Sequence, residues 1–430
     1  MKGDFPMILE FSVANTLSIK EKQTISFEAV QNNELDDLHF IKTDDGKKIL
    51  KMACVYGANA SGKSNILVAL NLYLNFILYS FTELKPSAPI PHIPFLFTDK
   101  IKNGEFELIF YIPQNDNLIR YEYYISLNMD CVVKETLFYA PKKQRKLLYQ
   151  RDMQNIKWGT DILGVKKIIS DLTRPNCTVL AAGAQANQPI LANIHKYLNQ
   201  RYKGIILSEL GNLENDVLKL MDENIEFKSK VINILNASDI SPITDIEIET
   251  QEMPDDYFKL LPADIKQEFS KKGEKPKKRD ATFTHKIGDS GFDLPYKLES
   301  NGTRRMLELS MPLVDLSESS LVLIDEIESS LHQDLLEMLI KLFLTISNDS
   351  QLIFTTHNQD LLDSGLLRDD EIWFCIKGPD GSSKYNSVTD YIGIRKEVSR
   401  KKYYQADKFG GIPNIDFTKL GELFSAKKDK

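Results

Sequence analysis

The chain has 430 residues, of which 42% are hydrophobic and 27% are charged, and its formal net charge is −7. This length and composition predict a large buried core divided between two lobes, and the acidic balance argues against a surface coated for nucleic acid, while leaving room for a local basic groove. The four cysteines form no C-x-x-C pair, so we expect no disulfide framework or zinc site and predict a cytoplasmic location.

The N-terminal region shows no leader or membrane pattern. Residues 1–5 are followed by a strand pattern and not by an apolar stretch of signal-peptide type. The longest apolar helical segment, residues 66–81, is interrupted by Asn71 and Asn75, so no membrane contact is expected. Residues 7–30 predict a hairpin, because apolar and polar residues alternate over 23–30.

The next feature is a phosphate-binding motif. Residues 57–64 read GANASGKS and fit the pattern G-x-x-x-x-G-K-[ST]. An apolar run at 49–56 precedes the motif and helical apolar spacing follows it over 65–73, which is the strand–loop–helix context that such a loop needs. The alternative is a chance loop rich in Gly and Ser.

Each motif residue has an expected role. Gly57 and Gly62 let the backbone curl so that its N–H groups point at phosphate oxygens. Lys63 would reach the β- and γ-phosphates, and the Ser64 hydroxyl would ligate Mg²⁺. The full set expected to bind the nucleotide here is Gly57, Asn59, Ser61, Gly62, Lys63, Ser64 and Asn65. ATP is favoured over GTP, because no N-K-x-D element follows the loop.

The middle of the chain changes character. A proline-rich connection at 86–94 leads to strand patterns at 105–112, 119–127 and 131–139, which predict an antiparallel sheet. Helical spacing follows at 162–172, 189–202, 207–221 and 227–235 without a sustained heptad repeat, so we predict a compact helical insertion. Residues 271–279 hold six Lys or Arg and are interpreted as a surface linker or, alternatively, a nucleic-acid contact.

Three elements in the last third carry polar residues at their ends. Residues 300–305 read SNGTRR and open an apolar helix. Residues 321–324 predict a strand buried on both faces that ends in Asp325 and Glu326, at the edge where open α/β sheets bind ligands. Asp325 would hold the Mg²⁺ shell and Glu326 would polarise a water, although a solvated acidic turn is the alternative. A further apolar strand ends at His357, and His332 lies either at a dimer seam or at an ordinary helix start.

These motifs and their order resemble those of the ABC/SMC-type ATPases. The resemblance implies an α/β head with a parallel core sheet and an antiparallel β-subdomain, in which 57–64 is the Walker A loop, Asp325 and Glu326 the Walker B pair and His357 the switch histidine. Lys63, Glu326 and His357 would then be catalytic. Ser300, Gly302 and Thr303 would be a signature motif that binds the ATP of a facing head, so a homodimer or higher oligomer is implied.

A narrower resemblance comes from residues 7–13, 57–65 and 300–305 and from the tail at 408–413. These segments are similar to bacterial ATPases tied to phage defence, including the RloA and abortive-infection AbiL types and, more distantly, the ATPase of the PARIS system. The resemblance implies a partner effector, such as a toxin or nuclease encoded next door. The insertion at 141–270 and the tail around Phe409 to Pro413 have apolar faces that the ATPase core does not need, so we expect the effector to bind one of these two segments. The resemblance spans 7–110 and 280–415, but the glutamine that ABC-type ATPases place after the first helix is missing from 91–98.

Two other functions remain as alternatives. A DNA repair ATPase of the RecF or SMC type is weakened by the missing coiled coil and the acidic balance. A nuclease that joins a similar head to a Toprim domain is disfavoured, because the tail after His357 is short and lacks a D-x-D. The predicted division is an N-terminal half of the head at 1–140, the helical insertion and linker at 141–279, and a C-terminal half of the head at 280–430.

Overall fold

The computed structural model describes residues 7–30, 36–43, 46–114, 117–141, 144–207, 214–238, 242–252, 277–315, 320–347, 349–394, 398–412 and 418. The chain divides into two compact units. Unit 1 consists of Met1–Tyr202 and Gln351–Lys430, and unit 2 consists of Lys203–Ser350.

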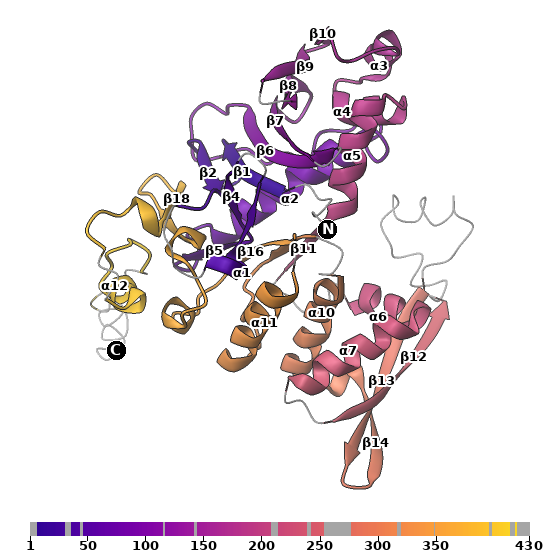
Figure 1. Ribbon diagram of the computed structural model, residues 1–430, viewed down its shortest axis with the longest axis vertical. Coiled ribbons are helices and arrows are strands. Elements are labelled where there is room, and N and C mark those ends of the chain that lie inside the picture. Colours follow the sequence, from indigo (N-terminus) through magenta and orange to yellow (C-terminus); the bar gives the residue numbers. More distant parts are fainter. Residues whose placement is uncertain are drawn as a thin grey trace, which may run out of the picture. The chain divides into compact units, whose positions relative to one another are not determined.

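An antiparallel sheet in unit 1 holds its strands in the order β10-β9-β8-β7-β6-β1-β2 (Figure 1). The predicted hairpin at 7–30 is confirmed as the pair of β1 and β2, and the predicted antiparallel strands at 105–139 are confirmed as β6, β7 and β8. Tyr121 and Tyr123 on β7 are buried in the core, so both side chains contribute to packing. The strands are β1 (Met7–Ala14), β2 (Gln23–Ser26), β6 (Gly104–Gln114), β7 (Asn117–Leu127), β8 (Val132–Ala140), β9 (Lys146–Asp152) and β10 (Asn155–Trp158).

A second group of strands in unit 1 runs in the order β16-β5-β17-β18. The central strand β5 (Met52–Gly57) is parallel to β16 (Gln351–Thr355) and to β17 (Ile372–Lys377), and β18 (Ser383–Ser387) pairs antiparallel with β17. Every residue of β5 is buried, as expected for a parallel strand covered on both faces. The helix α2 (Lys63–Tyr79) packs on β5, β16 and β1 through its apolar face.

The remaining elements of the N-terminal part of unit 1 are short. They are α1 (Asp36–His39), β3 (Phe40–Lys42), β4 (Lys48–Leu50), α3 (Lys166–Leu172), α4 (Val179–Gln185) and α5 (Pro189–Arg201). The helices α3 and α5 occupy two of the predicted helical segments, and α2 packs against α4 and α5. In contrast, β9 and β10 extend the antiparallel sheet through residues 146–158, which the sequence assigned to the helical insertion.

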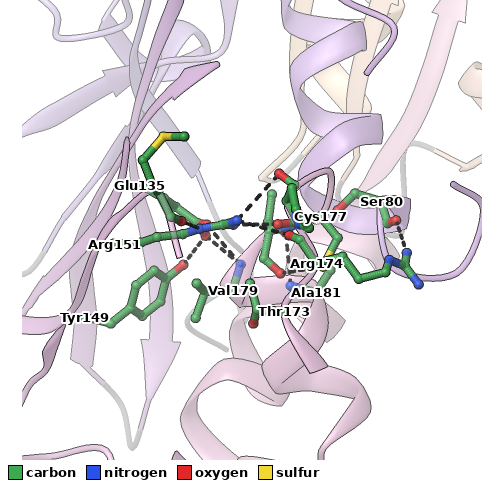
Figure 2. Close-up of polar contacts among 12 residues, drawn as sticks. Ser80, Glu135, Tyr149, Arg151, Thr173, Arg174, Cys177, Val179 and Ala181 are labelled. Carbon is green, nitrogen blue, oxygen red and sulfur yellow. Dashed lines mark hydrogen bonds and ion pairs between the residues drawn. The ribbon is translucent and has the colours of Figure 1, made fainter. Parts of the chain in front are cut away.

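A buried polar network fastens the start of α4 to the antiparallel sheet (Figure 2). The Glu135 carboxylate accepts hydrogen bonds from the Tyr149 hydroxyl at 2.7 Å and from the Val179 N–H at 3.0 Å. The Arg151 guanidinium lies 3.5 Å from Glu135 and donates to the Cys177 carbonyl at 2.6 Å. Buried charges are costly unless they are paired and hydrogen-bonded, so this network selects one position for α4 on the sheet.

The C-terminal segment packs on β17 and on β5, the strand that precedes the phosphate-binding motif. Phe409 is fully buried and stacks on Phe374 of β17 at 4.2 Å between ring centroids. Tyr404, at the end of α12 (Arg400–Gln405), lies 6.3 Å from the ring of Tyr56 on β5. The side chain of Phe409 is therefore part of the core, contrary to the expectation that the tail around it offers an apolar face to a partner, and Pro413 lies outside the described residues.

Unit 2 contains its own sheet and helices. The strands β12, β13 and β14 form an antiparallel sheet, and α6 packs on β13 while α7 packs on β12 and α10 (Figure 1). In the same unit β11 lies beside β15. The bounds are β11 (Tyr202–Ile206), α6 (Glu214–Glu223), α7 (Ile225–Ala237), β12 (Ile243–Glu252), β13 (Lys277–Ile287), β14 (Ser290–Pro295), α10 (Asn301–Asp315), β15 (Leu321–Ile324) and α11 (Gln333–Ile346).

The boundaries of the two units differ from those of the predicted three-part division. The chain passes between units at 202/203 and at 350/351, whereas the sequence placed boundaries at 140/141 and 279/280. Most of the predicted basic linker at 271–279 lies outside the described residues. None of the helices in the described ranges has the length and apolar character that crossing a membrane requires.

Candidate functional site

The motif at 57–64 joins β5 to α2, in the strand–loop–helix arrangement that its sequence predicts. Gly57 closes the strand where a Cβ atom would lie 2.5 Å from the Cys375 carbonyl oxygen of β17, so a side chain cannot be accommodated. Gly62 precedes α2 with φ 101° and ψ 20°, a left-handed conformation that favours glycine. Both glycines are therefore required by the backbone path, and the loop fits a phosphate ligand.

Two side chains from β18 hold the loop carbonyls. The Ser383 hydroxyl donates to the Ser61 carbonyl at 2.5 Å, and the Tyr385 hydroxyl donates to the Gly62 carbonyl at 2.6 Å. In a trans peptide the N–H points opposite to the carbonyl. These contacts therefore direct the N–H groups of Gly62 and Lys63 away from β18. Burial raises the pKa of Tyr385, which keeps its hydroxyl protonated as a donor.

A turn between β1 and β2 also braces the loop. The Ser18 hydroxyl lies 2.6 Å from the Ser383 hydroxyl and accepts a hydrogen bond at 2.6 Å from the side-chain amide of Asn65. The Asn65 side chain, expected to bind the nucleotide, thus contributes to the loop scaffold. Sequence reasoning missed Ser18, Ser383 and Tyr385, since these ordinary polar residues lie far from the motif and belong to no recognisable pattern.

The reactive residues of the motif differ in exposure. Lys63 is 5% exposed, and its ammonium donates to the Ala58 carbonyl at 3.1 Å, so its side chain curls back across the loop. Ser64 is half-buried at the first turn of α2, and Asn59 is exposed at the loop tip. The loop thus presents an ammonium and a hydroxyl at the start of one helix, which suits a magnesium-bound phosphate ester.

His357 follows β16 at the same end of the parallel strands as the loop. Thr355 on β16 is in register with Val55 on β5, and the Thr356 N–H donates to the Val55 carbonyl at 3.1 Å. The His357 side chain is exposed just beyond this contact. Unit 1 therefore brings the switch-histidine candidate to the edge of the sheet from which the loop departs.

The carboxylate pair lies in unit 2, at the end of β15. Asp325 is 7% exposed, and its N–H donates to the Ile206 carbonyl of β11 at 2.8 Å. Glu326 is half-buried and has φ 44°, an unusual left-handed conformation for a residue that is not glycine. Left-handed residues other than glycine are strained, and they occur at functional sites as well as in turns.

The signature candidate opens α10 in the same unit. The Ser300 hydroxyl accepts from the Thr303 N–H at 3.1 Å and lies 2.9 Å from the Thr303 hydroxyl, so it caps the helix. Ser300 and Asn301 are exposed, as a contact to another molecule would require. A Cβ atom on Gly302 would lie 3.2 Å from the Ser330 carbonyl oxygen, so the first turn of α10 packs on the turn after Glu326.

Two histidines of unit 2 have structural contacts. The His285 ring on β13 is 2.6 Å from the Glu299 carboxylate, the residue just before Ser300, and both side chains are buried. His332 is exposed and caps α11 by accepting from the Asp334 N–H at 3.4 Å, which supports its interpretation as a helix-start residue. His285 is a further residue near the signature that sequence reasoning missed.

Each unit therefore brings together some of the predicted site residues. Unit 1 carries the phosphate-binding loop and His357, and unit 2 carries the carboxylate pair beside the signature turn. The fold is of the predicted α/β type, with a parallel strand leading into the loop and an antiparallel sheet that contacts the loop helix.

The chain was compared with known protein families, curated proteins and solved structures. A family model described as "AAA domain, putative AbiEii toxin, Type IV TA system" matches residues 208–363. No curated protein matches the chain.

Among solved structures, the chain is similar to the SMC head domain from Thermotoga maritima, with 13% identity, coverage of 88% of this chain and 98% of that chain, and a TM-score of 0.40. An SmcHead bound to the C-winged helix domain of ScpA gives 15% identity, coverage of 92% and 99%, and a TM-score of 0.41. An Smc head with an extended coiled coil, bound to the C-terminal domain of ScpA derived from Pyrococcus furiosus, gives 14% identity, coverage of 94% and 99%, and a TM-score of 0.38.

Proposed function

We propose that the chain binds and hydrolyses ATP with Mg²⁺. The observation that carries the proposal is the phosphate-binding loop, whose glycines, helix start and oriented N–H groups suit phosphate oxygens. We assign phosphate binding to Lys63 and magnesium binding to Ser64 and Asp325. Mg²⁺ would neutralise charge on the phosphates and hold them in place. Glu326 would orient and polarise the attacking water, and His357 would assist it.

We further propose that two copies associate when ATP is bound. The support is the exposed start of α10, where Ser300 and Asn301 face solvent beside Leu298, which is 70% exposed. Because a helix N-terminus attracts anions, a second copy could offer this turn, with Ser300, Gly302 and Thr303, to a bound γ-phosphate. The association is head to head and leaves each chain with one nucleotide.

Substitution of the two central side chains tests hydrolysis and association together. Lys63→Ala should abolish ATP binding, because the loop loses its ammonium. Glu326→Gln should bind ATP normally and hydrolyse it about 10²–10⁴-fold more slowly, because it loses a general base. Light scattering of Glu326→Gln should show a larger mass with ATP than without it. Glu337→Gln on α11, paired at its surface with Lys341, is the matched control and should behave as wild type.

Each result bears on one part of the proposal. Wild-type turnover by Glu326→Gln would overturn the assignment of the base. A Glu326→Gln protein that is saturated with ATP but stays monomeric at micromolar concentration would overturn the association.

We propose that this ATPase controls a partner effector in anti-phage defence. The support is the description of the family model that matches residues 208–363, which names a putative AbiEii toxin of a Type IV TA system. The resemblance of the sequence motifs to defence ATPases points the same way. The effector would be a toxin or nuclease, and ATP binding or hydrolysis by this chain would restrain or release it after infection.

A further inference from the structure

A buried guanidinium connects the signature helix to the carboxylate turn within unit 2. Arg305 lies in the second turn of α10 and is fully buried. The Nη1 atom of the guanidinium donates to the Leu207 carbonyl at 2.7 Å. The Nη2 atom donates to the carbonyls of Asp325 at 3.1 Å and Glu326 at 3.4 Å. The Glu308 carboxylate, one turn further along α10, lies 3.4 Å from the guanidinium.

These contacts fix the backbone on both sides of Glu326. The Asp325 carbonyl belongs to the peptide plane before the Glu326 Cα atom, and the Glu326 carbonyl belongs to the plane after it. Since a peptide is planar, holding both carbonyls restrains the two backbone dihedrals of Glu326 and hence the direction in which its side chain leaves the backbone, along the Cα–Cβ bond. The Ser329 N–H also donates to the Glu326 carbonyl, at 2.9 Å. Together they maintain the left-handed φ of 44°, which an isolated Glu would leave.

The first turn of α10 touches the same region. Gly302 packs so closely on the Ser330 carbonyl that an added Cβ atom would lie 3.2 Å from its oxygen. The helix that begins with the signature residues therefore contacts the carboxylate turn at two points, through the backbone of Gly302 and through the side chain of Arg305. A shift of α10 would move both contacts.

We propose that Arg305 is a positioning residue that aims the Glu326 carboxylate and ties it to the signature turn of the same chain. The inference rests on the proposed ATPase function, because it assigns Arg305 a role in the hydrolytic step. Arg305 touches neither nucleotide nor water in this role. It acts through the two peptide planes that flank Glu326.

The test compares two adjacent arginines of α10. Arg305→Met removes the guanidinium. Arg305→Lys keeps the positive charge, but its single ammonium cannot donate to all three carbonyls as the planar guanidinium does. Arg304→Met is the matched control, because Arg304 is half-buried and lies against the Tyr296 ring at 5.0 Å instead. ATP Kd, kcat and melting temperature are measured for each purified full-length variant and for wild type.

We expect Arg305→Met to bind ATP within about twofold of wild type and to lose roughly 100-fold in kcat, as displacement of a reacting group by about 1 Å does. Arg305→Lys should fall between Arg305→Met and wild type, and Arg304→Met should retain wild-type kcat. Wild-type kcat in both Arg305 variants would overturn the inference.

A double variant separates positioning from charge balance. If Arg305 served only to neutralise buried Glu308, Arg305→Met combined with Glu308→Gln would restore both melting temperature and kcat, and that result would overturn the inference. We expect the double variant to regain melting temperature while kcat stays low. If Arg305→Met alone does not fold, the double variant and Arg305→Lys provide the kcat comparison. Absence of hydrolysis by wild type would instead overturn the proposed function.

Discussion

His92 is a buried imidazole at the start of the segment in which a coupling glutamine was expected. Its side chain is 6% exposed, the Gly104 backbone lies against its ring, and the ring meets Phe106 edge to face at 6.2 Å between centroids. Burial lowers its pKa from 6.5 to about 4, because the charged form cannot be hydrated there.

This pKa predicts that the chain loses stability in mild acid. Near pH 7 the imidazole is neutral in the folded and unfolded states. Between pH 6.5 and 4 the unfolded chain binds a proton that the folded chain excludes, so stability falls as pH falls, by about 2 kcal/mol at pH 5. Urea unfolding near pH 7 and pH 5 should show this loss in wild type and in His332→Gln, whose imidazole is exposed, but not in His92→Gln. An equal loss in His92→Gln would contradict the prediction.

At the scale of elements, the loop helix α2 is held at both ends by segments distant in sequence. Its N-terminal end is braced by β18 and the Ser18 turn. Beyond its C-terminal end, the Arg174 guanidinium donates to the carbonyls of Ser80, Phe81 and Leu84, each at 3.0 Å. A cation at this position also complements the helix dipole. Arg174 lies in the segment before α4. The polar contacts drawn in Figure 2 therefore connect the start of α4 with the end of α2.

Loss of this cap should destabilise unit 1. Arg174→Met should lower the free energy of unfolding by about 1.5–3 kcal/mol, the range for hydrogen bonds to a charged group. The Arg174 guanidinium lies over the Phe81 ring. Arg145→Met is the matched control, because Arg145 lies over the Phe138 ring and pairs with Glu122, but its side chain is 57% exposed. Its loss should cost less than about 1 kcal/mol. Urea denaturation measures both values, and equal effects would show that Arg174 does not cap α2.

At the scale of the whole molecule, the two motif sets belong to different units of one chain. The phosphate-binding loop and His357 are in unit 1, and the carboxylates and signature turn are in unit 2. An activity that needs all of them therefore depends on both units being folded. Phe409 is buried in unit 1, so we place the proposed effector contact on the segments of 141–270 and not on that side chain.

The defence role predicts a result in cells. The chain is expressed alone and together with its neighbouring gene, and the cells are challenged with a panel of phages. Protection should require both genes and should disappear with Lys63→Ala, because that variant cannot bind ATP, whereas Glu337→Gln should protect as wild type does. Full protection by the chain alone, or Mg²⁺-dependent DNA cleavage by the purified chain, would show that the chain carries its own effector activity.

The sequence alone determined the features that depend on neighbouring residues. The GANASGKS loop, the buried strand before it and the apolar helix after it lie within about thirty residues, so spacing and turn chemistry were sufficient. The start of α10 near residue 300 and the apolar strand β15 followed from the same local rules. The antiparallel strands β6, β7 and β8 were also predictable, because they are consecutive and alternate in polarity.

Only the tertiary structure decided which distant side chains hold these elements in place. Ser383 and Tyr385 orient the loop carbonyls from more than 300 residues away, and Arg305 holds the carboxylate turn through backbone atoms that have no sequence signature. β9 and β10 joined the antiparallel sheet instead of a helical insertion, because pairing of β9 with β8 and of β10 with β9 satisfied their backbone hydrogen bonds. Long-range hydrogen bonds and burial fix the position of an element and the orientation of its backbone, and for β9 and β10 they also decided the type of the element.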